Sequence, residues 1–249
     1  MKLTWTQGTV TENHHWTDKL YSLKISAEIE PFIAGQFTKL GLEVAGERIA
    51  RPYSLVNSPE EPWLEFYSIS IPSGSLSDRL MHLQPGDTVW VQQQAAGFLT
   101  LQETRPGKHL WLLATGTGIG PFLSLLKTEE PWQKFDKVIL VHAVRYAREL
   151  TYQHLVQSWQ QNKSKQFCYV PVISRESWGD ALTGRIPQAI VDHRLEARAG
   201  IDFNAQDSQV MLCGNPDMLT DTIKAFTEQK GLKRNRRRDP GNILTENYW

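Results

Sequence analysis

Three groups of residues in this 249-residue chain have types and spacing that could do chemistry. Arg51–Ser54 places a cation beside an aromatic ring and a hydroxyl, Gly116–Pro121 is a glycine-rich turn, and the chain closes on Tyr248 and Trp249. The first group suits a flavin, which needs charge for its pyrophosphate, a flat surface for its ring and a hydrogen bond at its reacting edge. A glycine turn that opens a helix offers backbone N–H groups to a second phosphate-bearing ligand. A terminal aromatic pair can cover a flat ring.

Composition places the chain among ordinary globular proteins. Apolar residues make up 40% of it and charged residues 22%, and the formal net charge is zero. Proteins that bind nucleic acid rely on a basic surface, which this balance disfavours. The N-terminus lacks the apolar core of a signal peptide, and no run reaches the ~18 apolar residues of a membrane span. We therefore expect a cytoplasmic protein that binds neither nucleic acid nor a membrane.

The cysteine and histidine pattern disfavours metal chemistry. Cys168 and Cys213 are too few for a four-cysteine iron–sulfur or zinc site, and the composition is not that of a disulfide-stapled secreted domain. His14 and His15 are adjacent, so on a strand their side chains point to opposite faces. We predict no metal site.

The chain divides into two halves with different periodicity. Before residue 104 apolar residues alternate with polar ones, as at Tyr21 and Leu23, which predicts an antiparallel β-barrel or sandwich. After Arg105–Gly107, apolar runs alternate with helical patterns, which predicts a parallel sheet wrapped by helices. We expect two domains: an antiparallel β-barrel domain over residues 1–104 and an α/β parallel-sheet domain over residues 105–249.

The second half has four apolar runs that predict strands, namely 110–114, 138–144, 167–173 and 209–213. Helices are expected from Pro121, over Tyr152–Trp159, and over a segment that carries Leu219 and Phe226 on one face and stops at Gly231. A short helix in the first half is expected to begin near Ser77, with the Ser77 hydroxyl as its cap.

Ligands of a parallel sheet bind at the carboxyl ends of its strands. Arg145 follows the second predicted strand, Ser174 and Arg175 follow the third, and Arg185 is near in sequence. Guanidinium groups around a serine suit a phosphomonoester dianion. A site for NAD usually has an acidic residue where Arg145 stands, so the pattern favours NADP(H). Cys213 ends the fourth predicted strand and is better explained as a small buried residue than as a reactive thiol.

Taken together, the motifs resemble those of ferredoxin–NADP⁺ reductases. Arg51–Ser54 resembles the flavin motif of that family, Gly116–Pro121 its nicotinamide-domain turn, and Cys213–Met218 its C-G-x-P-x-M segment. Tyr248 and Trp249 resemble its carboxyl terminus. The resemblance covers essentially the whole chain and is greatest for the short bacterial subgroup, the flavodoxin/ferredoxin–NADP⁺ reductases.

The resemblance implies FAD held without a covalent bond, hydride exchange with NADP(H), and single-electron exchange with ferredoxin or flavodoxin. It implies FAD contacts from Arg51, Pro52, Tyr53, Ser54, Tyr67, Ser75, Leu76, Ser77, Thr117, Tyr248 and Trp249. It implies NADP(H) contacts from Gly118, Val144, Arg145, Ser174, Arg175, Arg185 and Asp217. The residues it places near the reacting atoms are Ser54, Cys213, Glu246 and Tyr248.

Within this resemblance, Arg51 contacts the FAD pyrophosphate, Tyr53 stacks on the isoalloxazine and Ser54 approaches its N5 edge. Tyr248 covers the other face of the ring, so it must move before hydride passes, which makes the carboxyl terminus a gate. Glu246 keeps the spacing to Tyr248 that a glutamate has in the longer plant-type enzymes.

Three other functions fit part of the pattern. An NAD(P)H-dependent flavin reductase that feeds a separate oxygenase shares the two-domain plan, and a flavin-binding sensor would hold FAD without turnover. The basic run Lys233–Arg238 is either a solvated segment or a docking patch for an acidic partner, and a nucleic-acid-binding role for its arginines is disfavoured by zero net charge. The choice between ferredoxin and flavodoxin stays open, and a monomer is expected.

Overall fold

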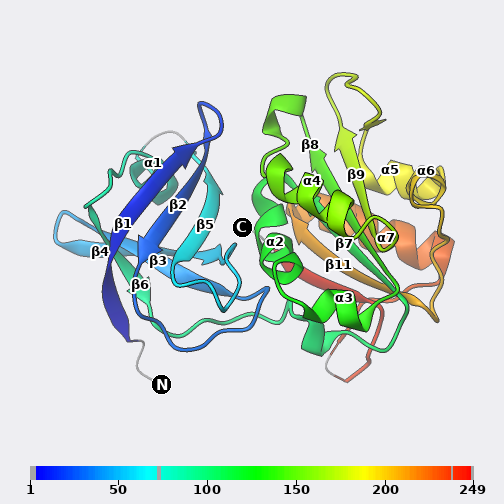
Figure 1. Cartoon of the computed structure of the whole chain (residues 1–249), viewed down its shortest axis with the longest axis horizontal. Coiled ribbons are helices and arrows are strands. Elements are labelled where there is room, and N and C mark those ends of the chain that lie inside the picture. The colour runs from blue at the N-terminus through cyan, green and yellow to red at the C-terminus, as the bar shows by residue number, and fades with distance from the viewer. Residues whose placement is uncertain (1–3, 72–73, 237, 248–249) are drawn as a thin grey trace. The chain divides into compact units, whose positions relative to one another are not determined.

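The computed structural model describes residues 4–71, 74–236 and 238–247 of the chain, which folds as two compact units (Figure 1). Unit 1 holds the described residues of Met1–Thr100 and Gly120–Thr128, and unit 2 those of Leu101–Ile119 and Glu129–Trp249. In the described ranges, no helix has both the length and the apolar character needed to cross a bilayer.

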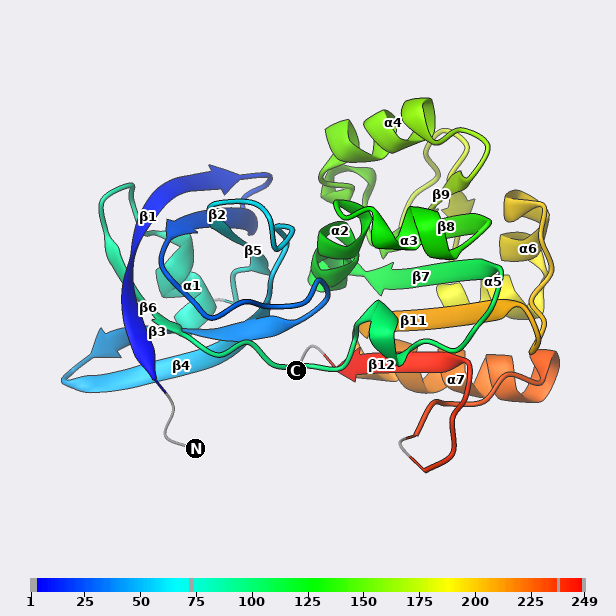
Figure 2. The same ribbon diagram turned by 60° about the horizontal axis from the view of Figure 1, so that its bottom comes forward.

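Unit 1 is built on one antiparallel sheet, as predicted. Its strands are β1 (Trp5–His15), β2 (Leu20–Ser26), β3 (Phe37–Val44), β4 (Glu47–Ser54), β5 (Leu64–Ile69) and β6 (Thr88–Gln92), in the order β4-β3-β6-β1-β2-β5. The sheet bends until its two end strands approach each other, where Leu55 forms a bridge with Phe66 (Figure 2). Pro52 lies on the end strand β4, where the missing N–H of proline costs no ladder hydrogen bond.

The interior of this barrel is apolar. Tyr21, Leu23 and Ile25 of β2 are buried there, which confirms the alternation in the sequence, and helix α1 (Leu76–Met81) packs against them. The cap of α1 is Ser75, whose Oγ accepts the N–H of Asp78 at 3.3 Å, so the predicted cap at Ser77 is wrong by two residues.

The hydroxyl of Ser77 has a different task. It accepts the backbone N–H of Ile71 at 3.1 Å, which joins the helix to the segment before it. Serine is a favourable N-cap residue, so either Ser75 or Ser77 could have capped α1. Because Ser77 Oγ is already bound to the Ile71 N–H, Ser75 is the cap.

Unit 2 contains a parallel sheet, also as predicted. Its strands are β7 (His109–Thr115), β8 (Lys137–Val144), β9 (Phe167–Ile173), β10 (Leu182–Thr183), β11 (Ser208–Gly214) and β12 (Ile243–Asn247), in the order β10-β9-β8-β7-β11-β12. The four predicted strands are confirmed, whereas β10 and β12 were not predicted, since two and five residues give too little periodicity.

Helices cover both faces of this sheet (Figure 2). They are α3 (Glu130–Lys134), α4 (Gln153–Asn162), α5 (Ile186–Val191), α6 (Arg194–Ala199) and α7 (Pro216–Lys230), with short 3₁₀ helices η1 (Leu101–Glu103), η2 (Gly116–Ile119) and η3 (Ala147–Glu149). On one face Trp132 and Trp159 each meet Phe167 edge-on, with ring centroids 5.9 Å apart. On the other, Phe203 lies 3.9 Å from Trp111 and 4.8 Å from Phe226.

The predicted limits of the helices hold in part. Helix α7 ends at Gly231, whose φ of +66° suits glycine, as expected. Tyr152 was placed in a helix but precedes α4 with φ +56°, and Gln153 is the first helical residue.

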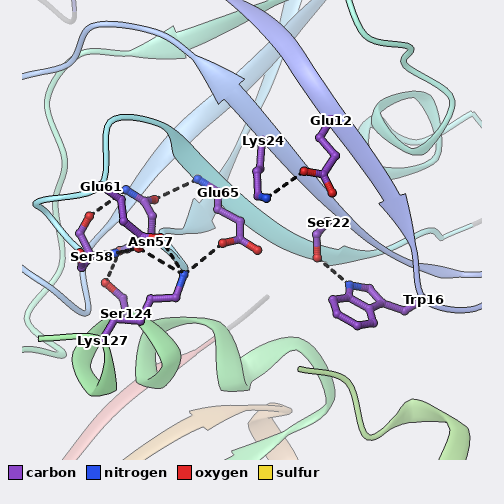
Figure 3. A network of polar contacts seen from close by, with 10 residues as sticks. All are labelled: Glu12, Trp16, Ser22, Lys24, Asn57, Ser58, Glu61, Glu65, Ser124 and Lys127. Carbon is purple, nitrogen blue, oxygen red and sulfur yellow. Dashed lines mark hydrogen bonds and ion pairs between the residues drawn. The ribbon is translucent and has the colours of Figure 1, made fainter. Parts of the chain in front are cut away.

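Helix α2 (Gly120–Leu126) follows η2 along the chain but packs within unit 1. Ser124 Oγ donates to the Asn57 carbonyl oxygen at 2.6 Å, and Asn57 Oδ1 accepts the N–H of Glu65 at 2.9 Å (Figure 3). Lys127, which follows the helix, pairs with Glu61 and Glu65, each at 3.2 Å. This polar network fixes α2 to β5 and to the loop that precedes it.

The Lys127–Glu65 pair is nearly buried, because its side chains are 14% and 8% exposed. Lys127→Met would leave the Glu65 carboxylate buried without this cation, so we predict that it lowers the free energy of unfolding by about 3 kcal/mol. Lys24→Met is the matched control, since the Lys24–Glu12 pair in the same unit is 34% and 50% exposed. We expect this control to lose under ~1 kcal/mol in denaturant titrations, and equal losses for the two variants would refute the role of the network.

Candidate functional site

The carboxyl ends of the unit 2 strands form one edge, because all paired strands of this sheet run parallel. The chain adds strands in one direction from β7 to β10 and then returns to place β11 on the other side of β7. Ligands bind at such a switch point in open α/β sheets. The turns that follow β7 and β11 therefore form the centre of the candidate site.

These two turns pack backbone against backbone. A Cβ atom on Gly118 would lie 2.6 Å from the Cys213 carbonyl oxygen and 2.8 Å from Gly214 Cα, so only glycine fits at this position. Gly214 has φ +134°, and the N–H of Asn215 donates to Thr115 Oγ1 at 2.9 Å. Gly118 and Gly214 are thus required by the contact between the turns, whereas a Cβ atom on Gly116 would meet no atom within 4 Å. Thr117, in the first turn, is buried.

His142 of β8 supports the first turn, although no motif in the sequence pointed to it. The fully buried ring sits on β8 with Nε2 3.0 Å from the Gly116 carbonyl oxygen. Burial lowers the pKa of His142 to about 4, while the Gly116 carbonyl raises it, so the imidazole is neutral at pH 7 and its Nε2–H donates. A histidine inside an apolar run was the available signal.

The residues predicted to hold a phosphate come together at the ends of β8 and β9. The N–H of Ser174 donates to the Val144 carbonyl at 3.1 Å, and that of Arg175 to the Arg145 carbonyl at 3.0 Å. The N–H of Gly184 donates to the Ile173 carbonyl at 2.9 Å, which brings the chain back to the same edge just before Arg185. Val144 is buried, whereas Ser174 and the three arginines are exposed.

Two carboxylates lie in the same loops but are bound to the backbone. Glu149 Oε2 accepts the N–H of Arg145 at 2.8 Å and that of Tyr146 at 3.2 Å, and Glu176 Oε1 accepts the N–H of Ala147 at 2.6 Å. Among the described residues, no ion pair involves the guanidinium of Arg145, Arg175 or Arg185. These cations are therefore available to an external anion.

At the other side of the site, Cys213 of β11 is paired in register with Glu246 of β12. Burial, together with the charge of Glu246, raises the pKa of Cys213 well above its usual value, so the thiol is neutral. Burial raises the pKa of Glu246 to about 7. Asp217 is exposed in the first turn of α7, and its N–H donates to the cap residue Asn215 at 2.9 Å.

In unit 1, the residues of the predicted flavin motif end β4. Arg51 and Pro52 are exposed, whereas Tyr53 and Ser54 are 8% and 4% exposed. Burial raises the pKa of Tyr53 to about 12, although Arg51 opposes this rise. Among the described residues, the Arg51 guanidinium donates only to the adjacent Ala50 carbonyl, at 2.8 Å, and can reach an anion from there.

Tyr21 links this motif to the segment Ser75–Ser77. Its hydroxyl donates to the Ser77 carbonyl at 2.7 Å. Burial raises the pKa of Tyr21, and Tyr53 and Asp78 are close enough to add to the rise. In the sequence, Tyr21 stood out only as one of the alternating apolar residues of a strand. Leu76 and Ser77 are buried, Ser75 is partly exposed, and Tyr67 of β5 is fully buried.

The remaining predicted residues, Tyr248 and Trp249, lie outside the described residues. The described side chains include no cluster of three or more His, Cys, Asp or Glu residues that could hold a metal ion.

Known proteins resemble this chain over nearly its full length. Residues 112–224 match the family model of the oxidoreductase NAD-binding domain. The chain is 47% identical over 245 residues to a flavodoxin/ferredoxin–NADP reductase of Escherichia coli, covering 98% of this chain and 99% of that protein. It is 38% identical over 243 residues to a ferredoxin–NADP reductase of Azotobacter vinelandii, covering 94% and 93%.

A solved structure is also similar. The crystal structure of a ferredoxin NADP⁺ reductase from Neisseria gonorrhoeae, with bound FAD and NADP, matches with a TM-score of 0.93 and 34% identity, over 98% of this chain and 99% of that one.

The raised pKa of Glu246 makes stability depend on pH. Because the folded chain holds this proton up to about pH 7 and the unfolded chain releases it near 4.5, the free energy of unfolding should fall as pH rises through this interval. We predict that Glu246→Gln removes roughly 2 kcal/mol of this fall, after allowance for partial exposure. Denaturant titrations at pH 5 and pH 8 measure the fall. A fall of the same size in the variant would contradict the assignment.

Proposed function

Since the chain belongs to the flavodoxin/ferredoxin–NADP reductase family, we propose that it is an FAD-dependent oxidoreductase that exchanges hydride with NADP(H) and single electrons with ferredoxin or flavodoxin. FAD, when bound, supplies the conversion between two-electron and one-electron transfer. In the structure, the observation that supports this function best is that Arg145, Ser174 and Arg175 come together at the edge where a parallel sheet binds nucleotides, and that these arginines form no ion pair with any described residue.

For the coenzyme, we propose that Arg145, Ser174, Arg175 and Arg185 hold the 2′-phosphate of NADP(H). The carboxylates beside them are bound to backbone N–H groups, so the guanidinium forks stay free for phosphate oxygens. Gly118, Val144 and Asp217 are the further proposed contacts. We assign Cys213 to the wall of the nicotinamide pocket, because its buried, neutral thiol is a poor nucleophile.

For FAD, we propose that Arg51 binds the pyrophosphate, Tyr53 stacks on the ring and Ser54 hydrogen-bonds its reacting edge. The exposed guanidinium of Arg51 fits an anion. The remaining proposed contacts are Pro52, Tyr67, Ser75, Leu76, Ser77, Thr117, Tyr248 and Trp249. We propose that Tyr248 and Trp249 act as a gate that must move before the nicotinamide reaches the flavin. We also propose that Glu246 exchanges protons, because its pKa of about 7 suits that role.

We further propose residues 1–104 as the FAD-binding domain and residues 105–249 as the NADP(H)-binding domain of a cytoplasmic monomer. Cys168 and Cys213 are both free, which supports a reducing compartment. Size-exclusion chromatography with light scattering tests the monomer.

The names of the relatives favour this function over a reductase that feeds an oxygenase and over a sensor. An anaerobic titration of the purified protein with NADPH, followed in the visible spectrum, tests it. We expect the flavin absorbance to bleach and to return when oxidised ferredoxin or flavodoxin is added. A flavin that NADPH does not bleach would point to the sensor, and a reduced flavin that neither carrier reoxidises would point to the oxygenase component.

The arginine cluster predicts coenzyme choice. Arg175→Ala or Arg145→Ala removes charge-assisted hydrogen bonds to the 2′-phosphate, so the KM for NADPH should rise roughly 10- to 100-fold while the KM for NADH changes little. The matched control is Arg148→Ala, an exposed arginine in η3 whose guanidinium packs 5.3 Å from the Tyr146 ring centroid. An equal loss for both coenzymes would refute the phosphate assignment.

A further inference from the structure

One tryptophan is packed unlike the others. Eight of the 9 tryptophans lie in the described part of the chain, since Trp249 does not. Seven of these eight place their ring against another ring or a cation, namely Trp5, Trp16, Trp63, Trp90, Trp111, Trp132 and Trp159. The eighth, Trp178, has no such partner among the described residues and is 52% exposed. A lone exposed apolar residue is common, so its location must decide whether it matters.

Trp178 lies on the loop that carries the proposed phosphate-binding residues. The loop leaves β9 at Ser174, and it returns where the Gly184 N–H donates to the Ile173 carbonyl at 2.9 Å. Trp178 is three positions beyond Arg175, so their Cα atoms are at most ~10 Å apart along an extended chain. Trp178 therefore lies on the same loop as Arg175, close along the backbone to the proposed phosphate-binding residues.

Contacts of its neighbours hold the backbone around Trp178 in a defined conformation. The Ala181 N–H donates to the Trp178 carbonyl at 3.1 Å and closes a turn. On either side of Trp178 in the sequence, Glu176 accepts the Ala147 N–H at 2.6 Å and Asp180 pairs with Arg198. Ala181 packs against the buried cluster of Val144, Leu150 and Ile173. Since these contacts order the backbone beforehand, a ligand that stacks on the indole pays little ordering entropy.

The chemistry of the coenzyme matches this placement. In NADP(H) the 2′-phosphate and the adenine are attached to the same ribose, so a ring beside the phosphate site lies where the purine comes. Aromatic side chains stack on purine faces, and indole offers the largest flat surface.

We propose that Trp178 forms the adenine subsite of the coenzyme site by stacking on the purine. The proposal rests on the proposed NADP(H) site at Arg145 and Arg175. Within that site, the arginines and Trp178 recognise different groups of the coenzyme. The arginines recognise the 2′-phosphate, which only NADP(H) carries. Trp178 recognises the adenine, which NAD(H) carries as well.

The test uses the FAD-loaded protein. Trp178→Ala should raise the KM for NADPH and for NADH by a similar factor, roughly five- to hundred-fold, because the lost stacking is common to both. The kcat/KM for reduced nicotinamide mononucleotide, which has no adenosine, should not change. Trp178→Phe should retain most of the affinity, since a smaller ring still stacks. Val191→Ala, which trims a 43% exposed apolar side chain in the same unit, is the control.

A binding measurement gives a second readout without turnover. Adenosine 2′,5′-bisphosphate should quench tryptophan fluorescence of the unaltered protein, and this quenching should be lost in Trp178→Ala and in Trp178→Phe, while Trp178→Phe still binds the nucleotide by calorimetry.

Three results would overturn the proposal: unchanged KM values in Trp178→Ala, a loss confined to NADPH, or an equal loss with reduced nicotinamide mononucleotide. Failure of the proposed function would look different, because the unaltered protein itself would then not be reduced by NADPH.

Discussion

The contact between two turns is the constraint on which the candidate site depends. The turns after β7 and β11 approach until Gly118 lies against the Cys213 carbonyl, and Thr115 Oγ1 accepts the N–H of Asn215. This approach fixes the direction of the η2 backbone and of the start of α7. The buried imidazole of His142 on β8 hydrogen-bonds the Gly116 carbonyl oxygen of the first turn. Gly118 and Gly214 are thus needed because the two turns pack closely. Any phosphate contact through their N–H groups depends on this packing.

The distribution of charge at the same edge follows a second constraint. Arginines on neighbouring loops repel one another, and nearby carboxylates often relieve this repulsion by forming ion pairs. Here Glu149 and Glu176 reduce the local positive potential while their oxygens accept backbone N–H groups. The loops are ordered by these bonds, and the guanidinium groups are left for a ligand. Pre-ordering of this kind lowers the entropy cost of binding a phosphate.

Much of this could be predicted from the sequence because its signals are local. Apolar runs predicted β7, β8, β9 and β11, and the residues after them predicted the arginine edge. Contacts between distant segments left no local signal. His142 appeared as one polar residue in an apolar strand, and its role depends on a carbonyl 26 residues earlier in the chain.

Two further features also depend on contacts that leave no local signal. Helix α2 follows a glycine turn of unit 2, yet its packing in unit 1 depends on Asn57, Glu61 and Glu65, more than sixty residues away. Ser75 and Ser77 are equally good caps by residue type, and only the use of Ser77 Oγ by the Ile71 N–H decides between them.

In the proposed site, the residues that recognise the adenosine end of the coenzyme lie apart from those near the reacting nicotinamide. Arg145, Arg175 and Trp178 lie at the ends of β8 and β9, whereas Cys213 and Glu246 lie on β11 and β12, on the other side of β7 in the sheet. Binding energy gained at the adenosine end can therefore offset unfavourable steps at the nicotinamide end, such as displacement of a covering aromatic ring. A buried neutral thiol and a carboxyl that titrates near pH 7 leave that second region with little fixed charge. Low fixed charge suits a pocket for the nicotinamide, whose own charge changes when hydride is transferred.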